Sequence, residues 1–312
     1  FKAEQRALLI LAAANPDDLE IQFDLADVVS WLGFAAQYDG DYVTALTHFE
    51  EMKMRLEQLI IREPNVLRWQ HKLTQSLHFI SEVQAITFNL SEALTTITRA
   101  VEIRDQLATA DPANQLWLIS QLSIKVQHAR VLIAMGETDD AQQILEQARL
   151  QLQALVAAEP TAQKYTRILA ASLRLEASLR FPTEISIAQQ LNDRALTLGE
   201  TLVETDRSDR WSIYEYAQAQ LLAGYLATDH ADLMQVQAHW HAALSALPAD
   251  WSDSHDWRLL EPGIHALLKL DRTTESHPLV TRLHRFGYHS FDPLAASVLE
   301  AAFPPHGSTQ NP

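Results

Sequence analysis

The apolar residues of this chain recur three and four positions apart, which is the spacing of one face of an α-helix. Such a stripe runs through Ala45, Phe49, Met52, Leu56 and Leu59. It returns 96 residues later as Ala141, Leu145, Ala148, Leu152 and Leu155. A single helix pair cannot bury such a stripe alone, so the pattern predicts helices that stack on their neighbours.

The spacing of four prolines indicates an internal repeat. Asn15-Pro16, Glu63-Pro64, Asp111-Pro112 and Glu159-Pro160 follow one another at intervals of 48 residues. Other positions keep the same phase: Ile21, Trp69, Trp117 and Tyr165; Gly40, Phe88 and Gly136; Ala45, Ala93 and Ala141. In the fourth unit the phase slips by one residue, which gives Ala188. A period of this length is typical of a solenoid.

Each unit is predicted to hold two helices. The proline is expected in the first turn of the first helix, where its missing N–H costs nothing. A glycine, or Asn89 in the second unit, is expected to break the chain between the two helices.

Two stretches resemble the tetratricopeptide repeat (TPR). "LGFAAQYDGDYVTALTHF" matches its pattern through Leu32, Gly33, Gly40-Asp41-Tyr42, Ala45 and Phe49. "MGETDDAQQILEQA" matches it again through Gly136, Ala141, Leu145 and Ala148. The resemblance implies an all-α fold, a right-handed superhelical solenoid of helix-turn-helix repeats. A usual TPR unit has 34 residues, so both helices here are expected to be about two turns longer.

A wider resemblance places the chain among larger proteins. Units with "ADPANQLW" that close in "LVTRLHRFGYHSFDP" are similar to the C-terminal TPR portions of large bacterial regulatory proteins. In that family the array follows a kinase, DNA-binding or nucleotide-hydrolysing module, often with a membrane segment between. The resemblance implies a scaffold or sensory region that binds a protein or peptide partner and has no enzymatic activity.

The repeat predicts four regions along the chain. Residues 1–15 are expected to be the tail of a truncated upstream repeat, and residues 16–205 to be four repeats of about 48 residues. Residues 206–303 are expected to form degenerate helical repeats and a cap, with Pro262 and Pro278 shortening or kinking two helices. Residues 304–312 are expected to be a disordered tail.

Charge and composition exclude several classes of function. The net charge is −16, and no basic face indicates a nucleic-acid partner. No apolar run reaches the roughly 18 residues of a membrane span, so this segment is not expected to insert into a bilayer. The absence of cysteine excludes disulfides and thiol nucleophiles. The compartment stays open between cytoplasm and periplasm, as does a membrane tether through an upstream segment.

The sequence carries no motif for a catalytic, metal or cofactor site. It has no phosphate loop, no dinucleotide fingerprint, no Gly-x-Ser-x-Gly and no His-Glu-x-x-His. His239 and His241 lie two positions apart, so on a helix they point in nearly opposite directions. Asp17, Asp18, Asp139 and Asp140 fall at expected helix starts, where they serve the helix dipole and caps. No cofactor and no metal are therefore expected.

The TPR resemblance implies that the first helix of each unit lines a concave groove. Counting back from the turns places these residues there: Trp31, Phe34, Tyr38, His78, Phe79, Glu82, Gln127, Arg130, Arg174 and Arg180. Aromatics at one end and arginines at the other suit an extended peptide with apolar and acidic portions. The alternative is that neighbours or solvent cover several of them. The recurring Trp69, Trp117 and Tyr165 favour packing between units over a ligand cage.

Two other functions remain open from the sequence. Repeat ends could stack head to tail, so the chain could be a self-association module that oligomerises an attached effector. A small-molecule sensor with a pocket inside the superhelix is the second alternative. A closed polar cavity with clustered ionisable residues would favour the sensor.

Overall fold

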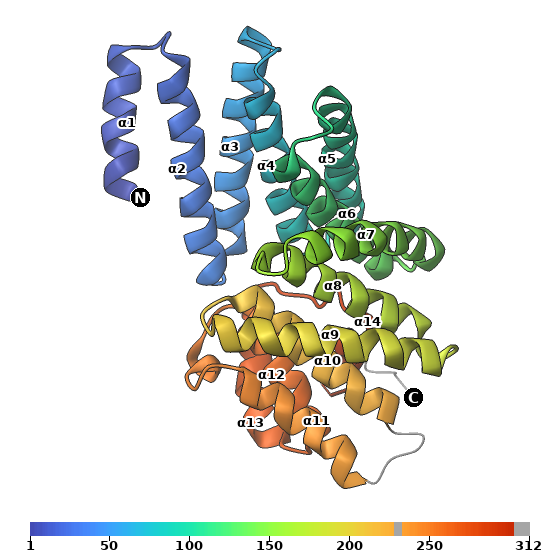
Figure 1. Ribbon diagram of the computed structural model, residues 1–312. Helices are drawn as coiled ribbons and strands as arrows, with labels where there is room; N and C mark the ends of the chain where they lie inside the picture. Colours follow the sequence, from blue (N-terminus) through green and yellow to red (C-terminus); the bar gives the residue numbers. More distant parts are fainter. Residues whose placement is uncertain (228–232, 303–312) are drawn as a thin grey trace, which may run out of the picture. The chain divides into compact units, whose positions relative to one another are not determined.

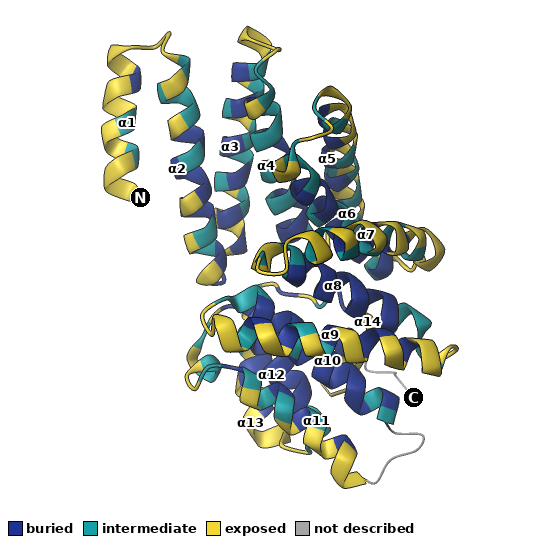
Figure 2. Ribbon diagram, in the orientation of Figure 1, coloured by how far each residue is buried: buried dark blue, intermediate teal, exposed yellow. Residues whose placement is uncertain are grey.

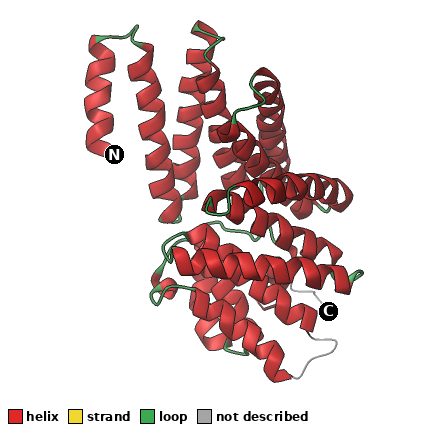
Figure 3. Ribbon diagram, in the orientation of Figure 1, coloured by secondary structure: helices red, strands yellow, loops and turns green. Residues whose placement is uncertain are grey.

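The protein is built from α-helices. The computed structural model describes residues 1–227 and 233–302, and in these ranges it holds α-helices, one short 3-10 helix and no strand (Figure 3). The all-α prediction is confirmed. The predicted tail, residues 304–312, lies outside the described residues. The chain divides into two compact units, residues 1–131 and 132–312, and each is described by itself.

The first unit is a row of helices that pack on their neighbours in the chain. Its helices are α1 (Lys2–Ala14), α2 (Leu19–Tyr38), α3 (Tyr42–Arg62), α4 (Leu67–Ile86), α5 (Leu90–Ala110) and the larger part of α6 (Gln115–Met135). From α1 to α5, each helix contacts the next (Figure 1). This is the TPR-like arrangement of consecutive helix pairs that the motifs predict.

The second unit begins with the same pairing and ends in a cluster around one helix. Its helices are α7 (Thr138–Ala158), α8 (Gln163–Arg180), α9 (Ile185–Thr205), α10 (Arg210–Ala227), α11 (Leu233–Ala246), the 3-10 turn Trp251–Asp253, α12 (Trp257–Lys269), α13 (Thr273–Arg285) and α14 (Pro293–Ala302). From α7 to α11 each helix contacts the next, whereas α12 contacts α10, α11, α13 and α14. Consequently α12 is buried along most of its length (Figure 2).

The helix starts reproduce the period of the sequence. First helices begin at Leu19, Leu67, Gln115 and Gln163, each 48 residues after the last. Second helices begin at Tyr42, Leu90 and Thr138 with the same interval, and then at Ile185 after 47 residues. That shorter step is the predicted slip. The division into regions at residues 15, 205 and 303 stays a prediction.

The apolar stripe of the second helices forms the core. Ala45, Phe49, Met52 and Leu56 are fully buried, and so are Ala141, Leu145 and Leu152. Gly33 of α2 lets this packing close, because a Cβ at that position would lie 2.5 Å from the Phe49 ring. In this unit the small residue of the Leu-Gly pair is therefore a helix-packing residue.

The repeating prolines lie in a turn before the first helix, and the expectation that they sit in its first turn is wrong. Pro16 precedes α2 by three residues, and Pro64, Pro112 and Pro160 hold the equivalent place. The residue before each proline is not helical, with φ between −144 and −133° and ψ between 71 and 84°, because the proline ring disfavours a helical conformation there. The preceding helix therefore ends, and the next begins after the turn, at the N-cap Asp18 in the case of α2.

The break between the two helices of a unit needs a left-handed residue. Gly40 and Gly136 supply it with φ of +74 and +84°. In the second 48-residue repeat Phe88 takes this place with φ +61°, and the predicted breaker Asn89 is instead the N-cap of α5. Phe88 lies at the glycine phase of the repeat, so the surrounding hairpin imposes the conformation.

None of the helices in the described ranges has the length and apolarity that crossing a bilayer requires.

The buried stripe contains one charged residue, and its replacement is expected to stabilise the protein. Arg104 lies at the position of Leu56 and Leu152 and is 1% exposed. Its Nη2 donates to Ser120 Oγ at 2.6 Å, while Nε and Nη1 have no partner among the described residues. Burial lowers the pKa of this guanidinium to about 10, which records an unfavourable site for the charge.

We expect Arg104→Leu to raise the free energy of unfolding by about 1–3 kcal/mol, because it restores the leucine of the repeat and removes a buried charge that no carboxylate neutralises. Urea denaturation followed by circular dichroism measures the change. Arg99→Leu, which removes an exposed arginine of the same helix, serves as the control. A loss of stability in Arg104→Leu would contradict this account of the core.

Candidate functional site

A row of aromatic side chains joins Phe1, the residue before α1, to helices α2, α3 and α4 of the first unit. This aromatic row comprises Phe1, Trp31, Phe34, Phe49, His78 and Phe79. Phe34 lies at its centre, with ring centroids 4.7 Å from Phe79, 5.3 Å from Phe49 and 5.9 Å from Trp31. Edge-on and tilted contacts of this kind are favourable for aromatic rings and hold them in place. The predicted residues Trp31, Phe34, His78 and Phe79 are thus brought together.

The aromatic row runs from a buried base to an exposed end. Phe49 is fully buried under Phe34 and Phe79, whereas Trp31 is 48% exposed. Phe1 stacks on Trp31 with centroids 5.5 Å apart and rings 7° from parallel, and it is itself 57% exposed. The exposed rings therefore stand on a rigid core, so little conformational entropy would be lost if a partner covered them.

Polar residues lie beside the row. Gln37 of α2 donates from Nε2 to Glu82 Oε1 of α4 at 2.6 Å, and both side chains are buried. This bond ties the two helices together, so Glu82 serves the packing of the unit. Tyr38, one turn along from Phe34, is 41% exposed. Gln127 and Arg130 of α6 are buried.

The two predicted arginines of the second unit have carboxylate partners close by. Arg174 is buried, with Nε 2.8 Å from Glu215 Oε2 and Nη1 3.1 Å from Asp292 Oδ2. Arg180 at the end of α8 pairs with Glu184 at 2.7 Å. Carboxylates of the same unit thus neutralise both arginines. That one groove is lined by all ten predicted residues stays a prediction.

A second cluster of ionisable residues is buried around Glu261 of α12. Glu261 Oε1 accepts hydrogen bonds from Tyr214 Oη at 3.0 Å and from Gln218 Nε2 at 2.7 Å, and its Oε2 accepts from Tyr288 Oη. Burial, together with the charge of Asp292, raises the pKa of Glu261 to about 7. This network fastens the segment after α13 to α10 and α12.

The cavity beside this network is too small for a substrate. Arg174, Gln218, Tyr225, His265 and Asp292 are among the residues that line it, and its volume is about 10 Å³. That space corresponds to one water molecule. His265, which lines this cavity, stays neutral because burial lowers its pKa to about 4. Its Nε2 lies 2.9 Å from Tyr225 Oη.

Sequence reasoning missed this network for an identifiable reason. Arg174 meets Glu215 and Asp292 from 41 and 118 residues away, in the part of the chain where the 48-residue phase is lost. The one sequence signal is the "GYHSFDP" stretch, which contains Tyr288 and Asp292 and belongs to the segment that resembles the end of bacterial TPR regions.

No group of three or more His, Cys, Asp or Glu side chains in the described ranges is arranged to hold a metal ion. His239 lies with Nδ1 2.8 Å from Gln220 Oε1, and His241 is exposed. Asp18 caps α2, and Asp139 and Asp140 lie in the first turn of α7, so these carboxylates have the structural roles that the sequence predicts.

Comparisons with known proteins find only solved structures of low similarity. No family model matches the sequence, and no curated protein matches it. The crystal structure of BtubC (BKLC) from P. vanneervenii is 15% identical, with 78% of this chain and 92% of that chain covered and a TM-score of 0.47.

Two further solved structures are similar over most of the chain. A tetratricopeptide repeat protein from Parabacteroides merdae is 14% identical, with 89% and 98% of the two chains covered and a TM-score of 0.32. The Rap conjugation gene regulator of plasmid pLS20, in complex with the Phr* peptide, is 14% identical, with 93% and 78% covered and a TM-score of 0.40. The TPR-like description rests on the helix pairing and the repeat of this chain.

The buried carboxyl of Glu261 predicts a pH dependence of stability. Its pKa is higher in the folded than in the unfolded state, so the folded protein binds the proton more tightly, and stability falls as pH rises from about 4.5 to about 7. We expect Glu261→Gln to remove about 2 kcal/mol of this fall between pH 5 and pH 7.

Urea denaturation at several pH values measures the difference between variant and wild type. Glu102→Gln, which removes an exposed carboxyl in the first unit, is the matched control. An unchanged pH profile in Glu261→Gln would show that this carboxyl is ionised in the folded protein.

His265 has the opposite effect on the pH dependence of stability, because its lowered pKa makes stability fall as pH drops from about 6.5 to about 4.

Proposed function

We propose that this chain is a non-enzymatic, protein-binding helical repeat that holds a segment of a partner against the aromatic row. The observation that carries the proposal is the exposure of Trp31 and Phe1 on a buried aromatic base. Exposed aromatics that are fixed by their neighbours are the usual anchors of protein interfaces. The partner segment would bury its apolar side chains against Trp31 and Phe34.

The charge of the chain favours a particular kind of partner. Arg174 and Arg180 are already paired with carboxylates, and the net charge is −16. A partner with basic residues beside its apolar anchors would be attracted to such a surface. An acidic portion of the partner, which the arginines suggest from sequence alone, has less support.

The wider context follows from the sequence resemblance. The repeats are similar to the C-terminal TPR portions of large bacterial regulatory proteins, so we propose that the chain is the interaction or sensory region of such a regulator. Binding of the partner would then be reported to a module elsewhere in the protein.

Selection of peptides tests the role of the aromatic row. We expect random 12-residue peptides displayed on phage and selected on the wild-type chain to carry aromatic or aliphatic anchors with basic neighbours. Trp31→Ala is expected to weaken binding of a selected peptide at least tenfold, since truncating an interface anchor commonly costs about 2 kcal/mol or more. Fluorescence anisotropy measures the dissociation constant.

Val43→Ala is the matched control, because Val43 is also strongly exposed but lies outside the aromatic row. Circular dichroism confirms that both variants are folded. Selected peptides that bind wild type and Trp31→Ala equally would remove the aromatic row from the binding surface.

Self-association is a second candidate, and the surface of α1 favours it. Leu9, Ile10 and Leu11 are all exposed on this helix, and Ile10 is 71% exposed (Figure 2). A second copy of the chain could cover this surface. Sedimentation velocity would then show a concentration-dependent dimer that Ile10→Glu disrupts, while a monomer at all concentrations would exclude this function for the chain.

A further inference from the structure

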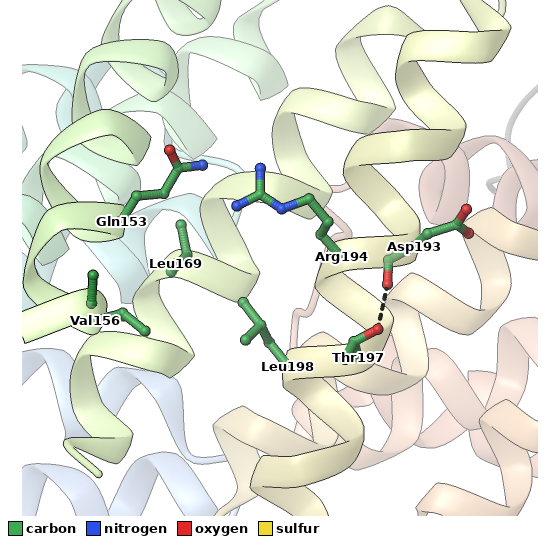
Figure 4. A pocket seen from close by; sticks show the side chains of 8 residues that line it. Gln153, Val156, Leu169, Asp193, Arg194, Thr197 and Leu198 are labelled. Carbon is green, nitrogen blue, oxygen red and sulfur yellow. Dashed lines mark hydrogen bonds between the residues drawn. The ribbon is translucent and has the colours of Figure 1, made fainter. Parts of the chain in front are cut away.

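A pocket opens between two second helices of the second unit. It lies between α7 and α9, with Leu169 of α8 as its floor, and has a volume of about 520 Å³ (Figure 4). Val156 and Leu198 form apolar walls, and Arg194 lies on the side of α9. Small-molecule sites commonly combine such a volume, a mainly apolar lining and a few placed polar groups.

The charge of Arg194 is not neutralised within the described part of the chain. No carboxylate there lies within ion-pair distance of its guanidinium. Gln153 of α7 faces it, and in the amide orientation that satisfies both groups, opposite to the one drawn in Figure 4, the amide oxygen accepts from Nη1 at 3.1 Å and Nη2 at 3.0 Å. Asp193, the preceding residue, points away from the guanidinium (Figure 4). The pocket thus combines an apolar interior with a cation that has a neutral partner only.

The repeat shows what ordinarily occupies this place. Arg194 is the tenth residue of α9, as Arg99 is of α5, and Gln153 is the sixteenth of α7, as Glu57 is of α3. In the first unit Arg99 Nη2 lies 2.7 Å from Glu57 Oε1, an ion pair between neighbouring second helices. At the equivalent place in the second unit an amide has replaced the carboxylate, so the cation has lost its anion.

The apolar lining departs from the repeat in the same place. Val156 and Ala157 stand where the first unit has Ile60 and Ile61. Ile60 packs against the buried core of that unit. The smaller side chain of Val156 leaves space over Leu169, which is the equivalent of Leu73. The position that lacks the carboxylate, Gln153, and the position with the smaller side chain, Val156, therefore line the same pocket.

We propose that this pocket binds a small organic acid with an apolar body. Its carboxylate takes the place of the missing glutamate opposite Arg194, where charge-assisted hydrogen bonds from a guanidinium are strongest. Its apolar body lies on Leu169 between Val156 and Leu198. The site is separate from the aromatic row, so it does not depend on the partner-binding function.

Isothermal titration calorimetry with octanoate and octanamide tests the proposal on the full chain. These probes share the apolar body and differ in charge. We expect octanoate to bind at least tenfold more tightly than octanamide, because a guanidinium forms stronger hydrogen bonds to a charged carboxylate than to a neutral amide. Equal binding of the two, or no binding of octanoate, would overturn the proposal.

The repeat itself supplies the variants. Gln153→Glu rebuilds the ion pair of the first unit, so it should leave the fold intact and remove the preference for octanoate. Val156→Ile with Ala157→Ile refills the pocket and should weaken both probes at least tenfold. Trp31→Ala should change neither, which separates failure here from failure of the proposed partner site.

Two results would contradict the assignment. Octanoate binding that persists in Gln153→Glu would mean that Arg194 does not hold the carboxylate. A short acetylated peptide ending in leucine, with a free carboxylate, that binds this site more tightly than octanoate would instead assign it to the C-terminus of a protein.

Discussion

Burial of the apolar stripe of each second helix against the neighbouring helices is the constraint on which the rest of the structure depends. Phe49 illustrates it: the ring is fully buried, approaches Gly33 of α2, and forms the base on which Phe34 and Phe79 rest. The exposed end of the aromatic row is therefore positioned by the core. The same stripe in α7 and α9 positions the helices that border the pocket at Arg194.

The parts of the fold that obey the repeat could be predicted from sequence. The interval of 48 residues gave the helix pairs, the turn glycines and even the one-residue slip before α9. The prediction for the prolines is wrong because their main effect falls on the preceding residue, whose non-helical backbone ends a helix. Phe88 was not foreseen in a left-handed conformation, since such a conformation costs an L-residue energy that only the surrounding hairpin can offset.

The site was predictable only where its residues lie close in the repeat. Trp31 and Phe34 are one turn apart on α2, and Phe79 follows on the equivalent face of the next first helix, so their meeting follows from the period. The partners of Arg174 come from one helix, α10, and from the loop before α14, both beyond the regular repeats. The repeat pattern of the sequence therefore does not indicate that Arg174 is buried and neutralised.

Departures from the repeat carry most of the information about function, because regular positions are explained by packing. In the aromatic row the positions follow the period but the residue types do not, because Gln127 and Arg130 stand two repeats after Trp31 and Phe34. The most direct measurement is therefore a crystal structure of the chain with a peptide selected on it. The account predicts an apolar side chain of the peptide against Trp31 and Phe34. A peptide seated elsewhere, with Trp31 still open to solvent, would contradict it.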